Sequence, residues 1–314
     1  MSFHLVVGHG PAGAATARLL AGRGHEVRVV TRGGRPARPA VPGVEHLALD
    51  ASDPAALARA AHGAAAVHGC AAPPLPQWTR LWPGLTASLC AAAEESGAVL
   101  VMLGNLYGYG PVAGPMTEDL PLAATGPKGR VRAASWERVR TLHEAGRIRA
   151  VEVRASDFFG PGVTDGGHLA ARVMPRLLKG RPVTVLGDPD APHSWTYLPD
   201  VARAMAEVAE DERAWGRAWH VPTAPPLPVR AMAGHLAAEA GAGPVAVRPL
   251  PSAVLAAAGL FSPLLRELRE TRYQFDRPFV VDCSAYEAAF TVRATPLEEQ
   301  VRATVAWWRE RERP

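Results

Sequence analysis

The sequence predicts an α/β fold of the Rossmann type, a doubly wound parallel sheet with a smaller, mainly helical C-terminal lobe. Three observations support this prediction. Apolar runs of strand length alternate with helix-forming segments up to residue 155, which is typical of a parallel sheet covered by helices on both faces. A glycine-rich turn at residues 8–13 (GHGPAG) follows the first apolar run and precedes a helix-forming segment. Beyond residue 153 the alternation loosens and helical segments dominate.

The first elements follow one another in the order strand, turn, helix, strand. Residues 3–7 form an apolar run of strand length, and helix formers follow the glycine turn up to Leu20. Gly22 and Gly24 end that helix, and residues 26–30 (EVRVV) predict a second strand. Further strands are expected at residues 44–49, 65–68 and 99–103, with helices after Pro54 and over residues 81–95.

The second half predicts longer helices and shorter strands, which indicates a change of architecture. Helices are expected at residues 169–179, 201–210, 229–240, 253–268 and 297–309, and short strands at 182–186 and 218–221. We therefore expect a dinucleotide-binding domain over residues 1–155, with 182–221 returning to it. A substrate-binding lobe is expected over residues 156–181 and 222–314.

Charge and hydrophobicity exclude two classes of partner. The net charge is +4, but the basic residues are spread from Arg18 to Arg313 with acidic residues between them. Nucleic-acid binders usually concentrate such charge on one face or tail, so no nucleic-acid partner is expected. The most apolar late stretch, residues 253–265, contains Gly259 and Pro263. It is too short and too interrupted to span a membrane.

The cysteines indicate the compartment. Cys70, Cys90 and Cys283 lie far apart and form no CxxC pair. This spacing fits reduced thiols in a cytoplasmic protein, and neither a disulfide framework nor a metal site. The N-terminus leads directly into a strand and a glycine turn, which leaves no room for a signal peptide. We therefore expect a cytoplasmic protein with a small-molecule substrate and no metal ion, and we leave a homodimer open.

The glycine turn predicts a dinucleotide site, because a GxGxxG pattern between a strand and a helix is more specific than the pattern alone. Gly8 allows the tight turn, Gly10 lets the backbone approach a pyrophosphate, and Gly13 allows close packing of helix and strand. The helix N-terminus adds amides and a favourable dipole for an anion. The candidate cofactor contacts around this turn are Gly8, Gly10, Pro11, Ala12, Gly13 and, after the strand at 65–68, Ala71.

The end of the second strand favours NADP(H) over NAD(H). An acidic residue there would bind the ribose 2′-hydroxyl, but this chain has Thr31 and Arg32, with Arg35 and Arg38 close behind. A guanidinium suits a dianionic 2′-phosphate, whereas a carboxylate would repel it. Asp50, after the third strand, is a candidate acceptor for the adenine amino group. The alternative is that Arg32 is a solvated residue in an arginine-rich protein.

Several further segments resemble the extended short-chain dehydrogenase/reductase family, the NAD-dependent epimerase/dehydratase group. Residues 106–108 (LYG) resemble the family's Val-Tyr-Gly, and Arg154 with residues 159–162 (FGPG) resembles its Arg and Tyr-Gly-Pro-Gly. Residues 197–202 (YLPDVA) are similar to Val-Asp-Asp-Val-Ala, and the C-terminal segment from Asp282 is similar to the family's end. The resemblance covers nearly the whole chain and implies a Rossmann fold, a nicotinamide cofactor and an oxidoreductase or epimerase activity.

The expected catalytic residues depart from the family's Ser-Tyr-Lys pattern. Leu103 occupies the place of the Ser or Thr four residues before Tyr107. If the alignment has no gap, Lys128 occupies the place of the acid/base Tyr, and Arg132 that of the activating Lys. Asn105 is the nearest polar replacement for the missing hydroxyl. The resemblance therefore implies an atypical member of the family.

Lys128 could still exchange a proton with a substrate. Positive charge from Arg132 and an oxidised nicotinamide would ease the loss of its proton, because like charges disfavour the charged form. A lysine brought near neutrality can act as an acid or base toward a carbonyl or hydroxyl. In the alternative interpretation Lys128 and Arg132 are surface residues or phosphate contacts at a helix start, so Lys128 is also a candidate cofactor contact.

The substrate region departs from the family as well. Its sugar-nucleotide enzymes hold a diphosphate with an Asn and an Arg, and the matching positions here are Asp157 and His193. A carboxylate repels phosphate, and a neutral His holds it less well than a bidentate Arg. Sugar nucleotides are therefore not expected as substrates. Asp157 and His193, together with Phe158, Phe159, Trp195 and Tyr197, instead predict an aromatic pocket with a few polar tips, although each aromatic residue could equally belong to the core.

The sequence thus favours an NADP(H)-dependent oxidoreductase, or an epimerase with transient oxidation, acting on a small non-nucleotide carbonyl or alcohol. In this hypothesis Lys128 donates the proton, Arg132 is its electrostatic neighbour, and Asn105 or Tyr107 orients the carbonyl. One alternative is an NADP(H) sensor that has lost this chemistry and acts through a partner. A second alternative is a non-redox reaction in the same pocket.

Overall fold

The computed structural model describes residues 2–35, 41–164, 167–251, 254, 267 and 270–312. The chain folds into two compact units. The first comprises residues 1–108, 122–155 and 201–221, and the second comprises residues 109–121, 156–200 and 222–314. Of the segment 182–221, residues 182–200 therefore belong to the second unit and residues 201–221 to the first. The helix expected over residues 253–268 lies outside the described residues except for Val254 and Glu267.

The first unit contains a seven-stranded sheet in which every neighbouring pair is parallel, and this confirms the predicted fold class. The strand order is β10-β6-β5-β4-β1-β2-β3. The order reverses between β1 and β4, which is the switch point where doubly wound folds bind dinucleotides. The strands are β1 (Phe3–Val7), β2 (Glu26–Thr31), β3 (Val44–Ala48), β4 (Ala66–Gly69), β5 (Val99–Asn105), β6 (Arg149–Ala155) and β10 (Ala218–His220).

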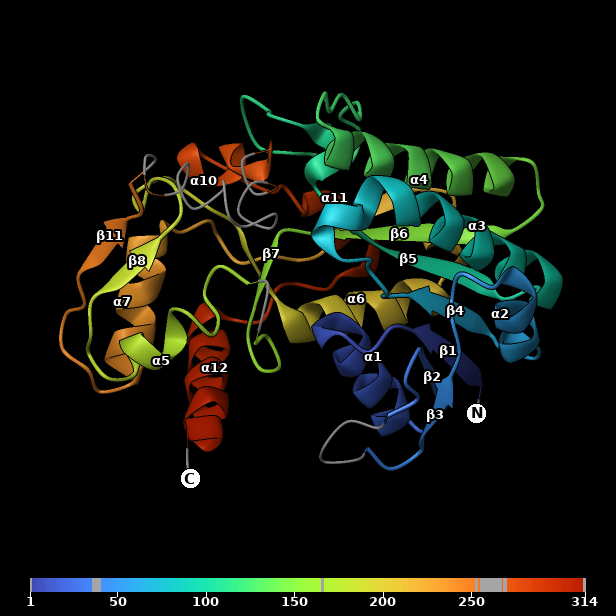
Figure 1. Ribbon diagram of the computed structural model, residues 1–314, viewed down its shortest axis with the longest axis horizontal. Coiled ribbons are helices and arrows are strands. Elements are labelled where there is room, and N and C mark those ends of the chain that lie inside the picture. The colour runs from blue at the N-terminus through green and yellow to red at the C-terminus, as the bar shows by residue number, and fades with distance from the viewer. Residues whose placement is uncertain are drawn as a thin grey trace. The chain divides into compact units, whose positions relative to one another are not determined.

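Helices cover both faces of this sheet, because its strands are apolar on both sides. Leu5 and Val7 of β1 pack in one core with Leu57, Leu89 and Trp136, which come from α2, α3 and α4. The alternate β1 residue, Val6, packs on the opposite face with residues of α1 and α6. Figure 1 shows α3 and α4 above the sheet and α1 and α6 below it. The helices are α1 (Pro11–Gly22), α2 (Pro54–Ala61), α3 (Trp78–Ser96), α4 (Pro127–Glu144) and α6 (Leu198–Glu210).

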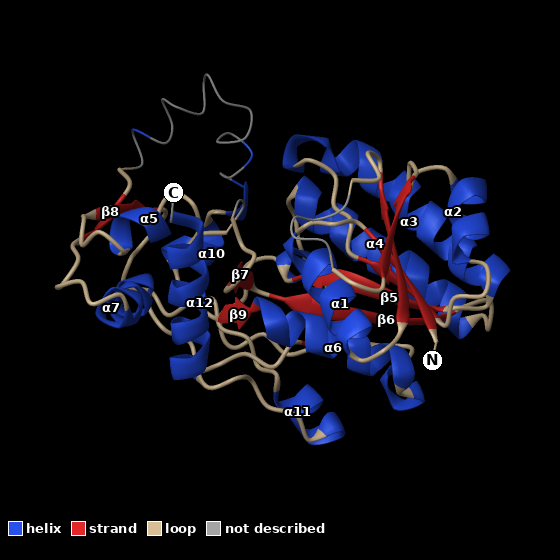
Figure 2. Cartoon of the chain, turned by 90° about the horizontal axis from the view of Figure 1, so that it is seen from below, coloured by secondary structure: helices blue, strands red, loops and turns tan. Residues whose placement is uncertain are grey.

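The second unit is built from short elements around its own apolar core. Phe159, Met174, Leu236, Val301 and Trp308 are among the buried residues of that core. Two parallel strand pairs form in it, β7 with β9, seen side by side in Figure 2, and β8 with β11. The elements are β7 (Asp157–Phe159), α5 (Met174–Leu177), β8 (Val183–Val185), β9 (Trp195–Tyr197), α7 (Val229–Glu239), β11 (Val247–Pro249), α10 (Tyr273–Asp276), α11 (Ser284–Phe290) and α12 (Leu297–Glu312). Within the described ranges, no helix is long and apolar enough to cross a bilayer.

Candidate functional site

Three glycines shape the turn between β1 and α1. Two of them pack closely against the backbone, and the third has free space beside it. Gly8 has a φ of +100°, and a Cβ atom there would lie 2.6 Å from the backbone of Ala71. A Cβ atom at Gly13 would lie 2.0 Å from the carbonyl oxygen of Gly8, so only glycine lets α1 pack this closely on β1. At Gly10 the same atom would meet nothing within 4 Å. The turn is thus closed toward the sheet and open at Gly10.

The N-terminus of α1 has the features of an anion site. Gly10 is the N-cap and is exposed, and no side chain caps the helix. Pro11 occupies the first helical turn, where its missing N–H removes no intrahelical hydrogen bond. Ala12 and Gly13 are buried against the sheet. The uncapped first-turn amides and the helix dipole favour a negatively charged group at this end.

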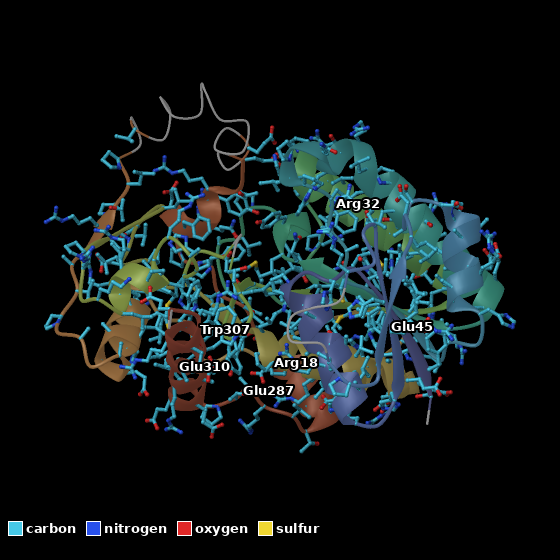
Figure 3. The ribbon with its side chains drawn as sticks, turned by 60° about the horizontal axis from the view of Figure 1, so that its bottom comes forward. Arg18, Arg32, Glu45, Glu287, Trp307 and Glu310 are labelled. Atoms are coloured by element: carbon cyan, nitrogen blue, oxygen red, sulfur yellow. The ribbon has the colours of Figure 1, made fainter. Side chains whose placement is uncertain are left out.

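The two residues expected near the adenosine lie at the carboxyl ends of neighbouring strands. Arg32 directly follows β2 and is exposed (Figure 3). Asp50 follows β3 and accepts hydrogen bonds from the Ser52 amide at 3.0 Å and the Ser52 hydroxyl at 2.8 Å. These two bonds, with a smaller contribution from the charge of Arg32, hold the pKa of Asp50 below its usual value. Arg32 and Asp50 therefore act on each other electrostatically.

Two of the residues expected to be catalytic, Lys128 and Arg132, lie near the start of α4. Lys128 and Arg132 are 3% and 4% exposed and lie one helical turn apart, so both project from one face of α4. A Cβ atom at Gly129, between them, would lie 2.5 Å from the carbonyl oxygen of Tyr107. The glycine therefore lets the start of α4 pack directly on the loop that follows β5.

Asn105 and Tyr107 shape that loop. The Tyr107 amide donates a hydrogen bond to the Asn105 side-chain oxygen at 3.2 Å, so Asn105 holds the chain where β5 ends. Both residues are half-buried. The Tyr107 ring lies 5.8 Å from that of Trp78 on α3, measured between centroids. The carboxyl end of β5 and the start of α4 thus carry the four candidate residues, which are Asn105, Tyr107, Lys128 and Arg132.

Arg132 is held by three different groups. Its Nη2 atom donates to the carbonyl oxygen of Leu103 at 2.8 Å and lies 3.6 Å from Glu152 Oε1. Its guanidinium carbon stands 4.1 Å above the ring of Trp82. Burial lowers the pKa of Arg132, and Glu152 opposes that shift. The Nη1 atom is buried without a hydrogen-bond partner among the described residues.

Glu152 links Arg132 to a second buried arginine. Its Oε2 atom accepts a hydrogen bond from Arg154 Nε at 2.7 Å, and both side chains are buried. A Cβ atom at Gly104, on the neighbouring strand, would lie 2.6 Å from Glu152 Oε1. Glycine at this position therefore makes room for the ion pairs. Glu152 and Trp82 were not among the residues predicted from the sequence. The charged Glu152 and Arg154 in the apolar interior of β6 are a signal that could have indicated Glu152, whereas nothing comparable marks Trp82.

The second unit pairs two of the expected substrate residues with each other. His193 Nε2 lies 2.8 Å from Asp157 Oδ2, and His193 Nδ1 lies 3.1 Å from the carbonyl oxygen of Gln274. His193 is buried and Asp157 is partly buried. The Asp157 carboxylate and the His193 imidazole are therefore hydrogen-bond partners of each other.

An aromatic recess lies beside this pair within the second unit. His193 lies on its wall together with His168, Trp195, Val229 and Phe275. The His168 ring stacks on Phe275 with centroids 4.6 Å apart, and burial lowers the pKa of His168 to about 4. The recess thus combines aromatic and apolar walls with a few polar side chains, which are those of His168, Asp188, His193 and Gln274.

The remaining aromatic candidates lie mostly in the core of the second unit. Phe159 is fully buried and Tyr197 is 6% exposed, and their rings lie 5.7 Å apart. Burial, assisted by Asp200 and Glu299, raises the pKa of Tyr197 to about 12. Phe158 is half-buried. Trp195 lies both in the core and on the recess, and its indole donates to the Leu227 carbonyl at 2.8 Å.

The sheet with its switch point and the open glycine turn define a dinucleotide-binding Rossmann protein. A model of the NAD dependent epimerase/dehydratase family matches residues 4–221. The chain belongs to the NAD dependent epimerase/dehydratase family, in agreement with the resemblance to extended short-chain dehydrogenases/reductases.

Solved structures agree with this fold over almost the whole chain. WbmH of Bordetella bronchiseptica, in complex with NAD+, has a TM-score of 0.75 at 20% identity over 99% of both chains. The dTDP-glucose 4,6-dehydratase of Bacillus anthracis, in complex with NAD, has a TM-score of 0.80 at 15% identity over 99% of this chain and 98% of that one. The UDP-glucose 4-epimerase of Thermus thermophilus, also with NAD, has a TM-score of 0.77 at 22% identity over 98% and 99%. No curated protein matches the chain by sequence.

Proposed function

We propose that this protein is an NADP(H)-dependent oxidoreductase, or an epimerase with transient oxidation, that acts on a small non-nucleotide carbonyl or alcohol. One observation supports the catalytic part most directly. Lys128 is a buried lysine at the start of α4, in the same turn as Gly129, which packs on the loop after β5. The carboxyl ends of the strands are where doubly wound folds place their ligands. Lys128 is therefore a buried proton donor at the edge where a cofactor binds.

The residues at the glycine turn fit a dinucleotide. Gly10 leaves open the space that a side chain would fill, and the uncapped start of α1 offers amides to a pyrophosphate. Arg132 Nη1, buried and without a partner among the described residues, is a donor for a ribose hydroxyl. When bound, a nicotinamide supplies a carbon that gives or takes a hydride. Ala71, against Gly8, borders the turn.

In this proposal Lys128 exchanges a proton with the substrate oxygen, and Asn105 or Tyr107 orients that oxygen. Besides offering Nη1 to a ribose, Arg132 is held in place by the Leu103 carbonyl, Trp82 and Glu152. Glu152 offsets part of its positive charge, so Arg132 assists proton release from Lys128 less than an unpaired guanidinium would. Lys128 is also a candidate cofactor contact.

The choice of NADP(H) rests on Arg32. Its exposed guanidinium follows β2, where an acidic residue would favour NAD(H), and a guanidinium suits a dianionic 2′-phosphate. The neighbours described above were solved with NAD. We propose that this chain differs from them in its adenosine pocket.

The choice of a non-nucleotide substrate rests on Asp157 and His193. The two side chains are 2.8 Å apart and satisfy each other, so the pair presents no unpaired cation to a diphosphate. The recess beside His193 is mostly aromatic and apolar. We therefore propose a substrate with an apolar body and one or two polar groups, contacted by His193, Trp195 and the half-buried Phe158.

Two alternatives each have an observation in their favour. Leu103 supplies a carbonyl to Arg132 where the resemblance expects a hydroxyl side chain, which favours a cofactor sensor without redox chemistry. The paired His193 and Asp157 favour a non-redox proton transfer in the second unit.

We place the protein in the cytoplasm, because its three cysteines are free thiols, as expected in a reducing compartment.

A lysine substitution tests the proposal. The sequence contains only two lysines, Lys128 and the 53% exposed Lys179, so Lys179→Met is a matched control for Lys128→Met. Purified protein is screened for NADPH oxidation and NADP+ reduction with a panel of small ketones, aldehydes and alcohols. We expect Lys128→Met to abolish turnover of any substrate found while NADPH affinity stays within about twofold, and Lys179→Met to change neither. Full turnover by Lys128→Met would exclude Lys128 as the proton donor, and a failure of the wild type to react with any compound would favour the sensor.

A further inference from the structure

Three potential metal ligands lie together at the amino-terminal edge of the first unit's sheet. His4 is the second residue of β1, His25 directly precedes β2, and Glu210 is the last residue of α6. One ligand atom from each lies within 4.8 Å of the other two. His4 is buried, His25 is half-buried, and Glu210 is about half exposed. The set therefore reaches from the interior to solvent.

Hydrogen bonds already orient this cluster. His25 Nε2 lies 3.3 Å from Glu210 Oε1, and His25 Nδ1 lies 2.8 Å from the Ser2 hydroxyl. The same hydroxyl lies 3.0 Å from His4 Nε2, and His4 Nδ1 lies 3.1 Å from His68 Nε2. His68 is fully buried, and its Nδ1 has no hydrogen-bond partner in the described part of the chain. His25 Nδ1 and His4 Nε2 thus both lie within hydrogen-bonding distance of the Ser2 hydroxyl.

The distances are close to those of a tetrahedral site. Metal–nitrogen and metal–oxygen bonds of about 2.0–2.2 Å place neighbouring ligand atoms about 3.4 Å apart. The pair His25 Nε2 and Glu210 Oε1 has this separation already, and the third ligand atom lies within 4.8 Å. Small rotations of exposed side chains would close the site.

We propose that His4, His25 and Glu210 bind a divalent transition-metal ion of the zinc class. Two imidazoles and one carboxylate are a donor set that suits Zn²⁺, and a water completes four ligands. His68 orients the His4 ring through the nitrogen that does not face the ion, as the outer partners of metal-bound histidines do. The spacing of 4, 25 and 210 in the sequence forms no recognisable motif, because three separate elements supply the ligands.

The position of the site indicates a structural role. It lies at the amino ends of the strands, whereas dinucleotides bind at the carboxyl ends. An ion there would tie the starts of β1 and β2 to the end of α6. The inference is independent of the proposed function, and the ion should stabilise the folded protein without changing its affinity for NADPH.

The test uses tag-free protein, because a histidine tag would itself bind the metal. After treatment with a chelator and its removal, Zn²⁺ is titrated in competition with a chromophoric chelator, and the melting temperature is measured with and without Zn²⁺. We expect one ion per chain, a rise of several degrees in melting temperature, and a Co²⁺ absorption spectrum typical of tetrahedral coordination. Glu210→Gln and His25→Gln should each weaken Zn²⁺ binding at least tenfold.

His235→Gln, an exposed histidine of the second unit, is the control and should bind Zn²⁺ as the wild type does. Glu210→Gln lies at the surface and keeps the shape of the side chain, so it tests the site even if His4 variants fail to fold. Binding of less than one ion per chain at micromolar Zn²⁺ would overturn the inference. So would binding that Glu210→Gln and His25→Gln leave unchanged.

Discussion

The guanidinium of Arg132 donates a hydrogen bond to the carbonyl oxygen of Leu103 at 2.8 Å, which joins the first turns of α4 to the end of β5. These two positions are the ones at which the family resemblance implies a lysine and a hydroxyl residue. The structure therefore brings the matched positions together, while both have changed chemistry. We propose that Lys128, one turn before Arg132, is the group at this place that transfers a proton.

Replacing Arg32 with alanine should reduce NADPH affinity and leave NADH affinity nearly unchanged. The expected loss for NADPH is about 1–3 kcal/mol, the usual size of a charge-assisted contact. Calorimetric titration of wild type and Arg32→Ala with both cofactors measures it. Arg59→Ala, an exposed arginine on α2, is the control. Equal affinity of the wild type for NADH and NADPH would contradict the assignment.

Replacing Glu152 with glutamine should destabilise the protein by about 3–5 kcal/mol, because it leaves Arg132 and Arg154 buried with a weaker partner. The matched control is Glu94→Gln, which breaks an exposed pair with Arg147 and should destabilise the protein far less. Urea denaturation of both variants gives the two free energies of unfolding. Similar losses for the two would show that the buried network contributes no more than a surface pair.

The protein should lose stability as the pH falls from 6.5 to 5, before most carboxylates are protonated. Burial, with the charge of a neighbouring histidine adding to it, lowers the pKa of His4 to about 4 and that of His68 to about 3. In the unfolded chain both titrate near 6.5, so the unfolded state binds more protons throughout this window. Each such histidine contributes a slope of about 1.4 kcal/mol per pH unit.

Burial likewise lowers the pKa of His168 to about 4, so His168 adds to this slope. Guanidinium denaturation at pH 7, 6 and 5, with EDTA present, measures the effect. His168→Gln should flatten the pH dependence, whereas His235→Gln should not. A free energy of unfolding that stays constant from pH 6.5 to 5 would mean that these imidazoles are not held neutral.

Sugar nucleotides should not bind. The paired Asp157 and His193 present a carboxylate and no unpaired cation to a diphosphate. UDP-, GDP- and dTDP-sugars should therefore leave the melting temperature of the NADP-loaded protein unchanged. A substantial rise with any of them would show that Asp157 and His193 have been misinterpreted.

The sequence predicts the first unit well because its signals are local. Strand, glycine turn and helix follow one another within residues 3–22, and the structure has β1 and α1 at those places. The alternation that followed them also predicted the parallel sheet. Shorter elements of the second unit gave weaker signals, and the helix expected over residues 169–179 is shorter in the structure, as α5.

The contacts that define the sites are long-range and were not predictable from one sequence. Glu152 lies twenty residues after Arg132, and Trp82 comes from another helix, so no spacing indicates their contact with Arg132. The pairing of Asp157 with His193 depends on the parallel alignment of β7 and β9. The sequence singled out Arg132, Asp157 and His193, but the contacts that these residues make appear only in three dimensions.

The presence of only two lysines allows the central proposal, that Lys128 lies at the edge where the cofactor binds, to be tested without a known substrate. In protein labelled with ¹³C at the lysine ε-carbon, Lys128→Met and Lys179→Met assign the two resonances. Addition of NADP+ should shift the Lys128 resonance and change its pH titration, while Lys179, at the surface beside Glu312, stays constant. A Lys128 resonance that does not move at saturating NADP+, with binding verified by calorimetry, would contradict the account.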